Sequence, residues 1–172
     1  ALERTKHVLF VKDYVRYLLT GAAATDRIEA QGTLFFDMKA GDWDRELVEM
    51  AGLTLEKLPS FIAPTDVAGH VTAEAAAATG LPEGMPVVCG SSDSAVEDYG
   101  AGAVEPGDLI IKLATAGNVN SMTAEANPHP KTLTYSHIVP GMWYSVSATN
   151  AAALCQRWMR DTWGFSDYGA MD

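Results

Sequence analysis

The chain has 172 residues, of which 48% are hydrophobic and 9% aromatic, and its formal net charge is −10 at pH 7. This length and apolar content predict a globular protein with one ordinary core or two small ones. Nucleic-acid binding depends on clusters of Lys and Arg that neutralise phosphates, and the sequence has no such cluster. The composition therefore argues against a nucleic-acid partner, although backbone amides could still hold a small anion.

The cysteine and histidine positions do not indicate a metal or disulfide framework. Cys89 and Cys155 lie in apolar stretches without C-x-x-C spacing, and the four histidines are scattered. The sequence contains no secretory signal and no apolar run long enough to span a bilayer. We expect reduced cysteines, a cytoplasmic location, no membrane partner and no metal site built from protein side chains alone.

The first predicted helix carries an apolar stripe and ends at Gly21. Its stripe consists of Val8, Val11, Val15 and Leu18. The charged residues Lys12, Asp13 and Arg16 fall between these positions, and we expect them on a solvated face.

Short strands and helices alternate in the next stretch. The predicted elements are a strand or buried turn at 33–36, a helix that starts within 42–44 and stops at Gly52, a strand at 67–70, a helix at 73–79 and a strand at 87–89. Thr72 is the expected N-cap of the helix at 73–79, and Gly80 ends that helix. A helix followed by a strand predicts an α/β layer.

The period of the sequence changes after a glycine-rich break at 100–108. A helix at 95–99 precedes this break, and we place a domain boundary between residues 102 and 103. Beyond it, a hairpin is predicted from strands at 109–113 and 118–122, followed by strands at 133–139 and 143–147. A last helix starts near residue 149, and its stripe is expected to face the core. That stripe comprises Leu154, Trp158 and Thr162, with Cys155, Met159 and Trp163 as further packing residues.

Two short stretches offer functional chemistry. Asp93 follows a predicted strand at the point where the pattern becomes helical, where a carboxylate can accept a proton from a hydroxyl within hydrogen-bond reach. By itself, Asp93 fits a helix-capping residue better than a catalytic base. The turn Thr115-Ala-Gly117 has small residues that let backbone amides approach a phosphate, but it also fits an ordinary hairpin turn.

Taken together, the motifs resemble the FGGY carbohydrate kinases, and within that family the xylulokinase-like members most closely. The matching stretches are Lys12-Asp-Tyr-Val-Arg-Tyr-Leu-Leu-Thr-Gly21, Ala24-Thr-Asp26, Gly32-Thr-Leu-Phe-Phe-Asp37, Gly80-Leu-Pro-Glu-Gly-Met-Pro-Val-Val88, Gly90-Ser-Ser-Asp93 and Gly100-Ala-Gly102. The resemblance starts near His7 and continues through Val139-Pro-Gly141 to Trp158, so it covers nearly the whole chain.

This resemblance implies an α/β fold of the actin-like, ribonuclease H-like type, with sugar and ATP meeting in a cleft between two domains. Residues 1–102 would be the C-terminal part of the first, sugar-binding domain. Residues 103–172 would begin the second, nucleotide-binding domain. The implied reaction is ATP-dependent phosphorylation of a sugar hydroxyl, with Mg²⁺ as cofactor. A ketopentose such as xylulose is the expected substrate, although other ketoses or polyols would also fit.

The resemblance also assigns roles to individual residues. Asp93 would be the catalytic base and a sugar ligand, and Ser94 occupies a position where relatives often carry an Asn or Gln that contacts the sugar. Thr115 and Gly117 match the Thr and Gly of the family's Gly-Thr-Ser-Gly phosphate loop. In this loop, alanines at 114 and 116 replace the first Gly and the Ser.

Two carboxylates depart from the family pattern after the base. Glu97 and Asp98 stand where relatives often have small apolar residues, and they would repel a nucleotide unless they point away or help to hold Mg²⁺. Since charged residues on a short helix usually face water, we expect both on a solvated helix face.

Family members are much longer than this sequence, which lacks the family's Asp-Gly-Thr phosphate loop and its adenine-binding segment. We therefore interpret the chain as a central piece of a kinase that is inactive alone. Its open sheet edges and apolar faces predict pairing with a second copy or with the missing segments. The alternative is a non-catalytic sugar-binding or assembly module that retains the fold.

Overall fold

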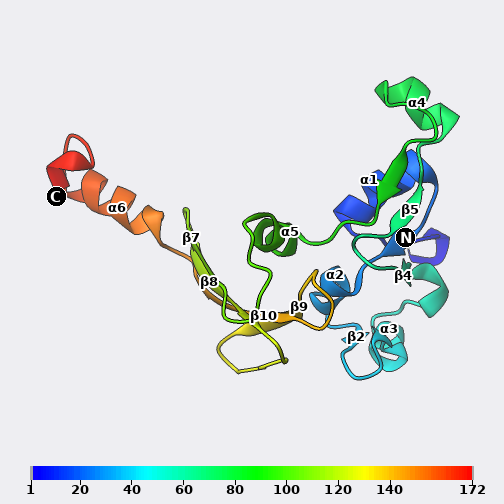
Figure 1. The fold of residues 1–172 in the computed structure, drawn as a ribbon, viewed down its shortest axis with the longest axis horizontal. Helices are drawn as coiled ribbons and strands as arrows, with labels where there is room; N and C mark the ends of the chain where they lie inside the picture. The colour runs from blue at the N-terminus through cyan, green and yellow to red at the C-terminus, as the bar shows by residue number, and fades with distance from the viewer. Residues whose placement is uncertain (1, 172) are drawn as a thin grey trace. The chain divides into compact units, whose positions relative to one another are not determined.

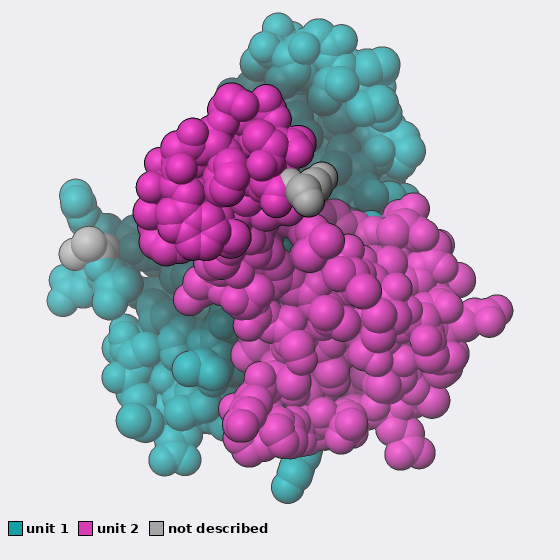
Figure 2. Space-filling view, turned by 90° about the vertical axis from the view of Figure 1, so that its left-hand side faces the viewer, with its two compact units in different colours: residues 1–96 teal, residues 97–172 magenta. Residues whose placement is uncertain are grey.

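The computed structural model describes residues 2–171 and has a mixed α/β architecture (Figure 1). The chain divides into two compact units, which comprise residues 1–96 and 97–172 (Figure 2). This division falls inside helix α5 (Asp93–Gly100), whereas a domain boundary between residues 102 and 103 stays a prediction.

The first unit consists of short elements that pair locally. In chain order they are η1 (Leu2–Arg4), α1 (Val11–Thr20), β1 (Ala24–Thr25), α2 (Arg27–Gln31), β2 (Phe36–Asp37), β3 (Asp42–Trp43), α3 (Arg45–Met50), η2 (Leu55–Lys57), β4 (Ser60–Phe61), β5 (Val67–His70), α4 (Ala73–Thr79) and β6 (Pro86–Val88), followed by the start of α5. Strands β1 and β4 pair in parallel, and the pairs β2–β3 and β5–β6 are antiparallel. The predicted strand and helix at 67–79 are confirmed.

Side-chain caps determine where several helices begin. The Thr72 hydroxyl accepts a hydrogen bond from the Ala75 amide at 3.2 Å, which confirms the predicted cap of α4. Asp44 caps α3 in the same way, so this helix begins after Asp42 and Trp43, which form β3. The predicted helix start within Asp42-Trp-Asp44 is confirmed at Asp44, because Asp42 and Trp43 pair with β2 instead.

Helix α1 buries the opposite face from the one that its apolar stripe predicts. Val11 is 84% exposed, and Val15 and Leu18 are also exposed. Asp13 is completely buried and Arg16 is 3% exposed, so the expectation that these charges face solvent was wrong. The two charges pair with each other at 2.9 Å inside the unit, which offsets part of the penalty for burying them.

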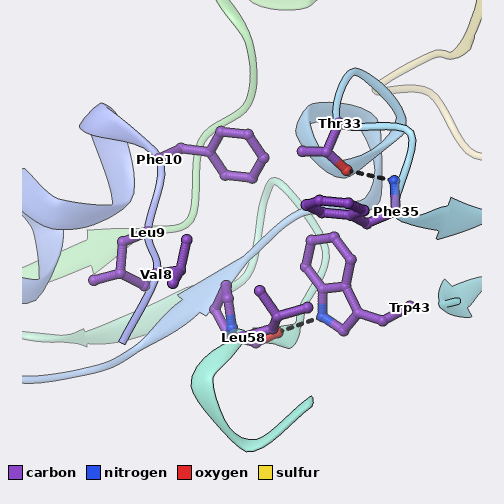
Figure 3. A pocket seen from close by; sticks show the side chains of 8 residues that line it. Val8, Leu9, Phe10, Thr33, Phe35, Trp43 and Leu58 are labelled. Atoms are coloured by element: carbon purple, nitrogen blue, oxygen red, sulfur yellow. Dashed lines mark hydrogen bonds between the residues drawn. The ribbon is translucent and has the colours of Figure 1, made fainter. Parts of the chain in front are cut away.

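An apolar cavity of about 200 Å³ lies between the segment before α1 and the β2–β3 region (Figure 3). Its walls come from Val8, Leu9, Phe10, Thr33, Phe35, Trp43, Leu58 and Pro59. The Trp43 indole nitrogen donates a hydrogen bond to the Pro59 carbonyl at 2.9 Å, so its single donor is already used. The cavity therefore offers mainly apolar contacts.

The second unit is built on a four-stranded antiparallel sheet. Its elements are the remainder of α5, β7 (Leu109–Leu113), β8 (Gly117–Thr123), β9 (Leu133–Ser136), β10 (Trp143–Thr149), α6 (Ala153–Trp163) and η3 (Gly169–Met171). The strand order is β7-β8-β10-β9, and the register pairs Leu113 with Gly117 at the turn of the first hairpin. The predicted hairpin and both later strands are confirmed, with β9 ending at Ser136 and β10 reaching Thr149.

One buried carboxylate links α5 to this sheet. Asp98 is completely buried, and its Oδ2 accepts a hydrogen bond from the Asn120 side-chain amide of β8 at 2.7 Å. The expectation of a solvated Asp98 was therefore wrong. Burial raises the pKa of Asp98, although the Asn120 hydrogen bond and the charges of Lys112 and His137 lower it in part.

Helix α6 does not pack as its stripe predicts. Within the described part of the chain, no α6 residue is buried, and Trp158 and Trp163 are each 61% exposed. Figure 1 shows the helix continuing past the end of the sheet of its own unit. Because no described α6 residue is buried in that unit, the predicted core-facing role of the stripe was wrong. Cys155 is exposed, whereas Cys89 is buried. No helix among residues 2–171 has the length and apolarity needed to cross a bilayer.

Gly69 on β5 tests the packing of α1 against this strand. A Cβ atom at this position would meet the Thr20 Cβ at 2.8 Å, too close for ordinary contact. We expect Gly69→Ala to lower the free energy of unfolding by about 1–3 kcal/mol, measured by urea unfolding with circular dichroism. Gly100→Ala is the matched control, because nothing lies within 4 Å of its added Cβ. A loss of equal size in both variants would contradict the close contact.

Asp98→Asn tests the cost of the buried charge. Because the pKa of Asp98 is raised in the folded state, folding favours its protonated form, and the associated stability is lost as the pH rises through the folded-state pKa. Removing this titration should raise the melting temperature relative to the native chain more at pH 7 than at pH 3.5. The exposed Glu105→Gln variant serves as control. Equal differences at both pH values for Asp98→Asn would contradict the prediction.

Candidate functional site

Asp93 is the first residue of α5 and is exposed to solvent. It follows strand β6 through a four-residue segment, 89–92, that we call the approach segment. Its Oδ1 accepts a hydrogen bond from the amide of the half-buried Ser94 at 2.6 Å. The two residues that the sequence predicts as base and sugar contact therefore lie together at the start of one helix.

Backbone hydrogen bonds attach the approach segment to the loop between β4 and β5. The Cys89 amide donates to the Asp66 carbonyl at 2.9 Å, and the Gly90 amide donates to the Pro64 carbonyl at 2.9 Å. Gly90 has a φ of +71°, a left-handed conformation that a residue with a side chain rarely adopts. The glycine thus lets the chain turn from β6 toward α5 while both amides stay bonded.

The Asp26 carboxylate is the centre of a buried polar network beside the approach segment. Its Oδ1 accepts hydrogen bonds from the Ser91 hydroxyl at 2.9 Å and from the amides of Ile28 and Glu29 at 3.0 and 3.1 Å. Its Oδ2 lies 2.9 Å from the Lys12 ammonium nitrogen. One buried carboxylate thereby caps α2, pairs with α1 and holds Ser91.

Arg16 and Asp13 extend this network along α1. The Asp13 Oδ1 lies 2.7 Å from the Lys12 Nζ and 2.9 Å from the Arg16 Nη2. The Arg16 guanidinium also donates hydrogen bonds to the backbone carbonyls of Ala24 and Cys89. Lys12, Asp13, Arg16 and Asp26 form what we call the Asp26 network, in which two positive and two negative charges balance.

The sequence reasoning missed this network. Lys12, Asp13 and Arg16 were assigned to solvent because charges on a helix usually face water. A usable signal was present, since Asp13 and Arg16 stand three positions apart and therefore lie on one face of α1. Asp26 lies in the stretch Ala24-Thr-Asp26 that resembles the family, but the sequence alone assigns it no role.

Burial and charge together shift the titration of several groups here. Burial lowers the pKa of Lys12, but the Asp13 hydrogen bond and the Asp26 charge outweigh it, so the net pKa is raised. Burial, with a contribution from the Asp26, Asp13 and Asp93 carboxylates, raises the pKa of Glu29 against the Lys12 charge. The Lys12 ammonium pairs with both Asp13 and Asp26.

Cys89 is an unreactive neighbour of the same network. Burial raises the pKa of its thiol to about 11, and the charges of Arg16 and Lys12 offset only part of this effect. Since the thiolate is the nucleophilic form of cysteine, Cys89 is poorly suited to covalent chemistry at neutral pH. Its contribution to the site is its backbone.

The turn between β7 and β8 holds Thr115 and Gly117 in the second unit. The amides of Ala152 and Ala153 donate to the carbonyls of Thr115 and Ala114, each at 2.9 Å. In a trans peptide the N–H points opposite to the C=O, so the amides of Thr115 and Ala116 point away from these donors. Thr115 and Ala116 are both exposed, so the turn lies at the surface of the second unit.

Gly117 is required by packing at this turn. A Cβ atom there would meet the Ala152 Cβ at 2.8 Å and the Lys112 carbonyl oxygen at 3.2 Å. The glycine thus permits the close approach of the chain before α6 to the hairpin. This approach also brings the Ala152 amide to the turn.

Glu97 lies on the surface and forms an ion pair with Lys112 of β7. The predicted solvent exposure of Glu97 is confirmed, and its charge has a partner of opposite sign within the second unit. Among residues 2–171, no three His, Cys, Asp or Glu side chains gather closely enough to hold a metal ion.

Comparison with known proteins identifies the family. The sequence model described as the FGGY family of carbohydrate kinases, N-terminal domain, matches residues 1–100. The xylulose kinase of Escherichia coli K12 is 29% identical over 166 residues, which cover 95% of this chain and 34% of that protein. The autoinducer-2 kinase of Yersinia enterocolitica is 34% identical over 153 residues, which cover 88% of this chain and 29% of that protein.

A solved structure gives the same result. The crystal structure of the xylulose kinase from Rhodospirillum rubrum superposes with a TM-score of 0.89 at 32% identity, covering 96% of this chain and 34% of that one. The predicted actin-like α/β fold of the sugar kinases is thereby confirmed. The chain spans about a third of the length of these relatives. With its family model matching more than half of its residues, the chain belongs to the FGGY family of carbohydrate kinases.

Proposed function

We propose that the protein carrying this chain is an ATP-dependent sugar kinase in which Asp93 is the general base. One observation carries the proposal: Asp93 is an exposed carboxylate at the first residue of α5, inside the stretch that matches the family. Its approach segment is held by backbone and side-chain hydrogen bonds, while the carboxylate itself is open to a substrate.

The reaction needs little covalent participation from the protein. The Asp93 carboxylate accepts the proton of the attacking sugar hydroxyl while the hydroxyl oxygen forms a bond to the γ-phosphorus of ATP. The bond between the γ-phosphorus and its bridging oxygen breaks, and ADP leaves with that oxygen. Positioning and charge stabilisation supply most of the catalysis in such a transfer.

The turn at 114–117 is proposed as a phosphate-binding loop. The exposed Thr115 hydroxyl and the outward amides of Thr115 and Ala116 are suitable donors for phosphate oxygens. Gly117 keeps the hairpin close to Ala152, which maintains the orientation of these amides. Mg²⁺, when bound with the nucleotide phosphates, neutralises part of their negative charge.

The proposed substrate is a ketopentose such as xylulose. The E. coli and R. rubrum relatives are both xylulose kinases, which favours this choice over other sugars. Ser94 is proposed to contact the sugar, because it adjoins Asp93 at the start of α5. Residues 1–102 would then belong to the sugar-binding domain and residues 103–172 to the nucleotide-binding domain.

Asp93→Ala in a kinase of full family length that contains this sequence tests the base. We expect kcat for xylulose phosphorylation to fall by roughly 10²–10⁴-fold, because a positioned general base contributes an effect of that size. A coupled assay of ADP release measures the rate, and the exposed Glu83→Gln variant, in the turn before β6, is the control. An unchanged kcat in Asp93→Ala would contradict the assignment.

The isolated 172-residue chain is expected not to phosphorylate xylulose, because it spans only about a third of its relatives. The measurement is xylulose-dependent ADP release by the purified chain, with calorimetry against xylulose and against ATP with Mg²⁺. Turnover by the isolated chain would refute this expectation. Xylulose binding without turnover by the full-length protein would instead support a non-catalytic sugar-binding module.

A further inference from the structure

We infer that the Asp26 network positions the proposed base through its hydrogen bonds to the approach segment. Arg16, Asp26 and Ser91 are then positioning residues for the reaction. This inference rests on the proposed function of Asp93. It concerns residues that never need to touch sugar or ATP, and it follows from contacts within the first unit alone.

The network forms hydrogen bonds to the approach segment at two residues. The Arg16 guanidinium donates to the carbonyl of Cys89, four residues before Asp93. The Asp26 Oδ1 accepts a hydrogen bond of 2.9 Å from the hydroxyl of Ser91, two residues before Asp93. The side-chain contacts thus lie on both sides of Gly90, the residue at which the chain turns.

The Asp93 side chain has little restraint of its own. Among the described residues, its carboxylate accepts a hydrogen bond only from the Ser94 amide, its immediate neighbour. Its direction is therefore set by the backbone that precedes it. A shift of the approach segment would move the carboxylate by a similar distance, and small misplacements of a reacting group reduce rates strongly.

The burial of the network explains why it can act as a rigid support. Asp13 and Asp26 are completely buried, and Arg16 is nearly so. Buried ions contribute little net stability compared with apolar residues of similar size, but breaking one contact leaves an uncompensated charge. In the structure every charge of the network lies within 3 Å of an opposite one, so moving one of these groups would separate an ion pair.

The network also connects the segment to two helices. Asp26 accepts hydrogen bonds from the amides of Ile28 and Glu29 at the start of α2. Arg16 and Lys12 belong to α1. Arg16 in addition donates to the Ala24 carbonyl of β1. The approach segment is thus connected to α1, β1 and α2 through the Asp26 carboxylate and the Arg16 guanidinium.

Ser91→Ala in a kinase of full family length that contains this sequence tests the inference with the least disturbance. It removes one hydroxyl and leaves all four charges of the Asp26 network in place. We expect kcat to fall about tenfold with an unchanged KM for ATP, because the loss of one charge-assisted hydrogen bond loosens the base but not the nucleotide. Ser91→Thr, which restores a hydroxyl, should recover most of the rate.

Thr72→Ala is the matched control. It also removes one hydroxyl of the first unit, which accepts a single hydrogen bond from the Ala75 amide at the cap of α4. Its stability loss should resemble that of Ser91→Ala, while its kcat should stay unchanged. An equal fall in kcat for both variants would show a general stability effect and overturn the positioning role.

Amide hydrogen exchange on the 172-residue chain tests the restraint without any activity. The bonded amides of Cys89, Gly90 and Val96 should exchange several-fold faster in Ser91→Ala than in the native chain, while those of α4 stay unchanged. Unchanged exchange at all three amides would overturn the inference even if kcat fell.

The two proposals fail in different ways. If Asp93→Ala abolishes phosphorylation but Ser91→Ala retains the native kcat, the positioning role is wrong and the base assignment stands. If Asp93→Ala retains the native kcat, the base assignment fails and the positioning role fails with it, whatever the exchange data show.

Discussion

The buried carboxylate of Asp26 is the constraint on which the first unit depends. A carboxylate without water needs a hydrogen-bond donor or cation for each of its oxygens, because an unpaired buried charge costs several kcal/mol. Asp26 obtains these partners from the first turn of α2, from Lys12 on α1 and from Ser91. Elements that are distant in sequence are thereby brought to one point, and the segment before Asp93 is one of them.

This constraint also decides which way α1 faces. Turning the valines and Leu18 of this helix inward would place Asp13 and Arg16 in water and leave the Asp26 network without its cations. The structure instead buries the charged side and exposes the apolar one. Within this unit, the buried side of α1 supplies donors to Asp26 and to the carbonyls of Ala24 and Cys89, while its apolar side is left exposed.

The second unit buries a carboxylate by different means. Asp98 faces the neutral amide of Asn120 at close range, and burial raises its pKa. In the first unit, by contrast, two cations lie within 3 Å of the buried carboxylates. Because the pKa of Asp98 is raised by burial, the packing of α5 on the sheet depends on pH.

The sequence by itself determined the family, the cap of α4 at Thr72, the hairpin before residue 123 and the place of Asp93 at the start of a helix, because these features depend on local motifs and turn chemistry. Only the tertiary structure decided which face of α1 is buried, that Asp98 is buried and that α6 stays uncovered. Periodicity shows that a helix has two faces, but it does not show what lies opposite each face. The sequence does not show whether water or a buried partner stabilises a charged residue. The Asp26 network therefore follows only from the packing of α1, α2 and the approach segment.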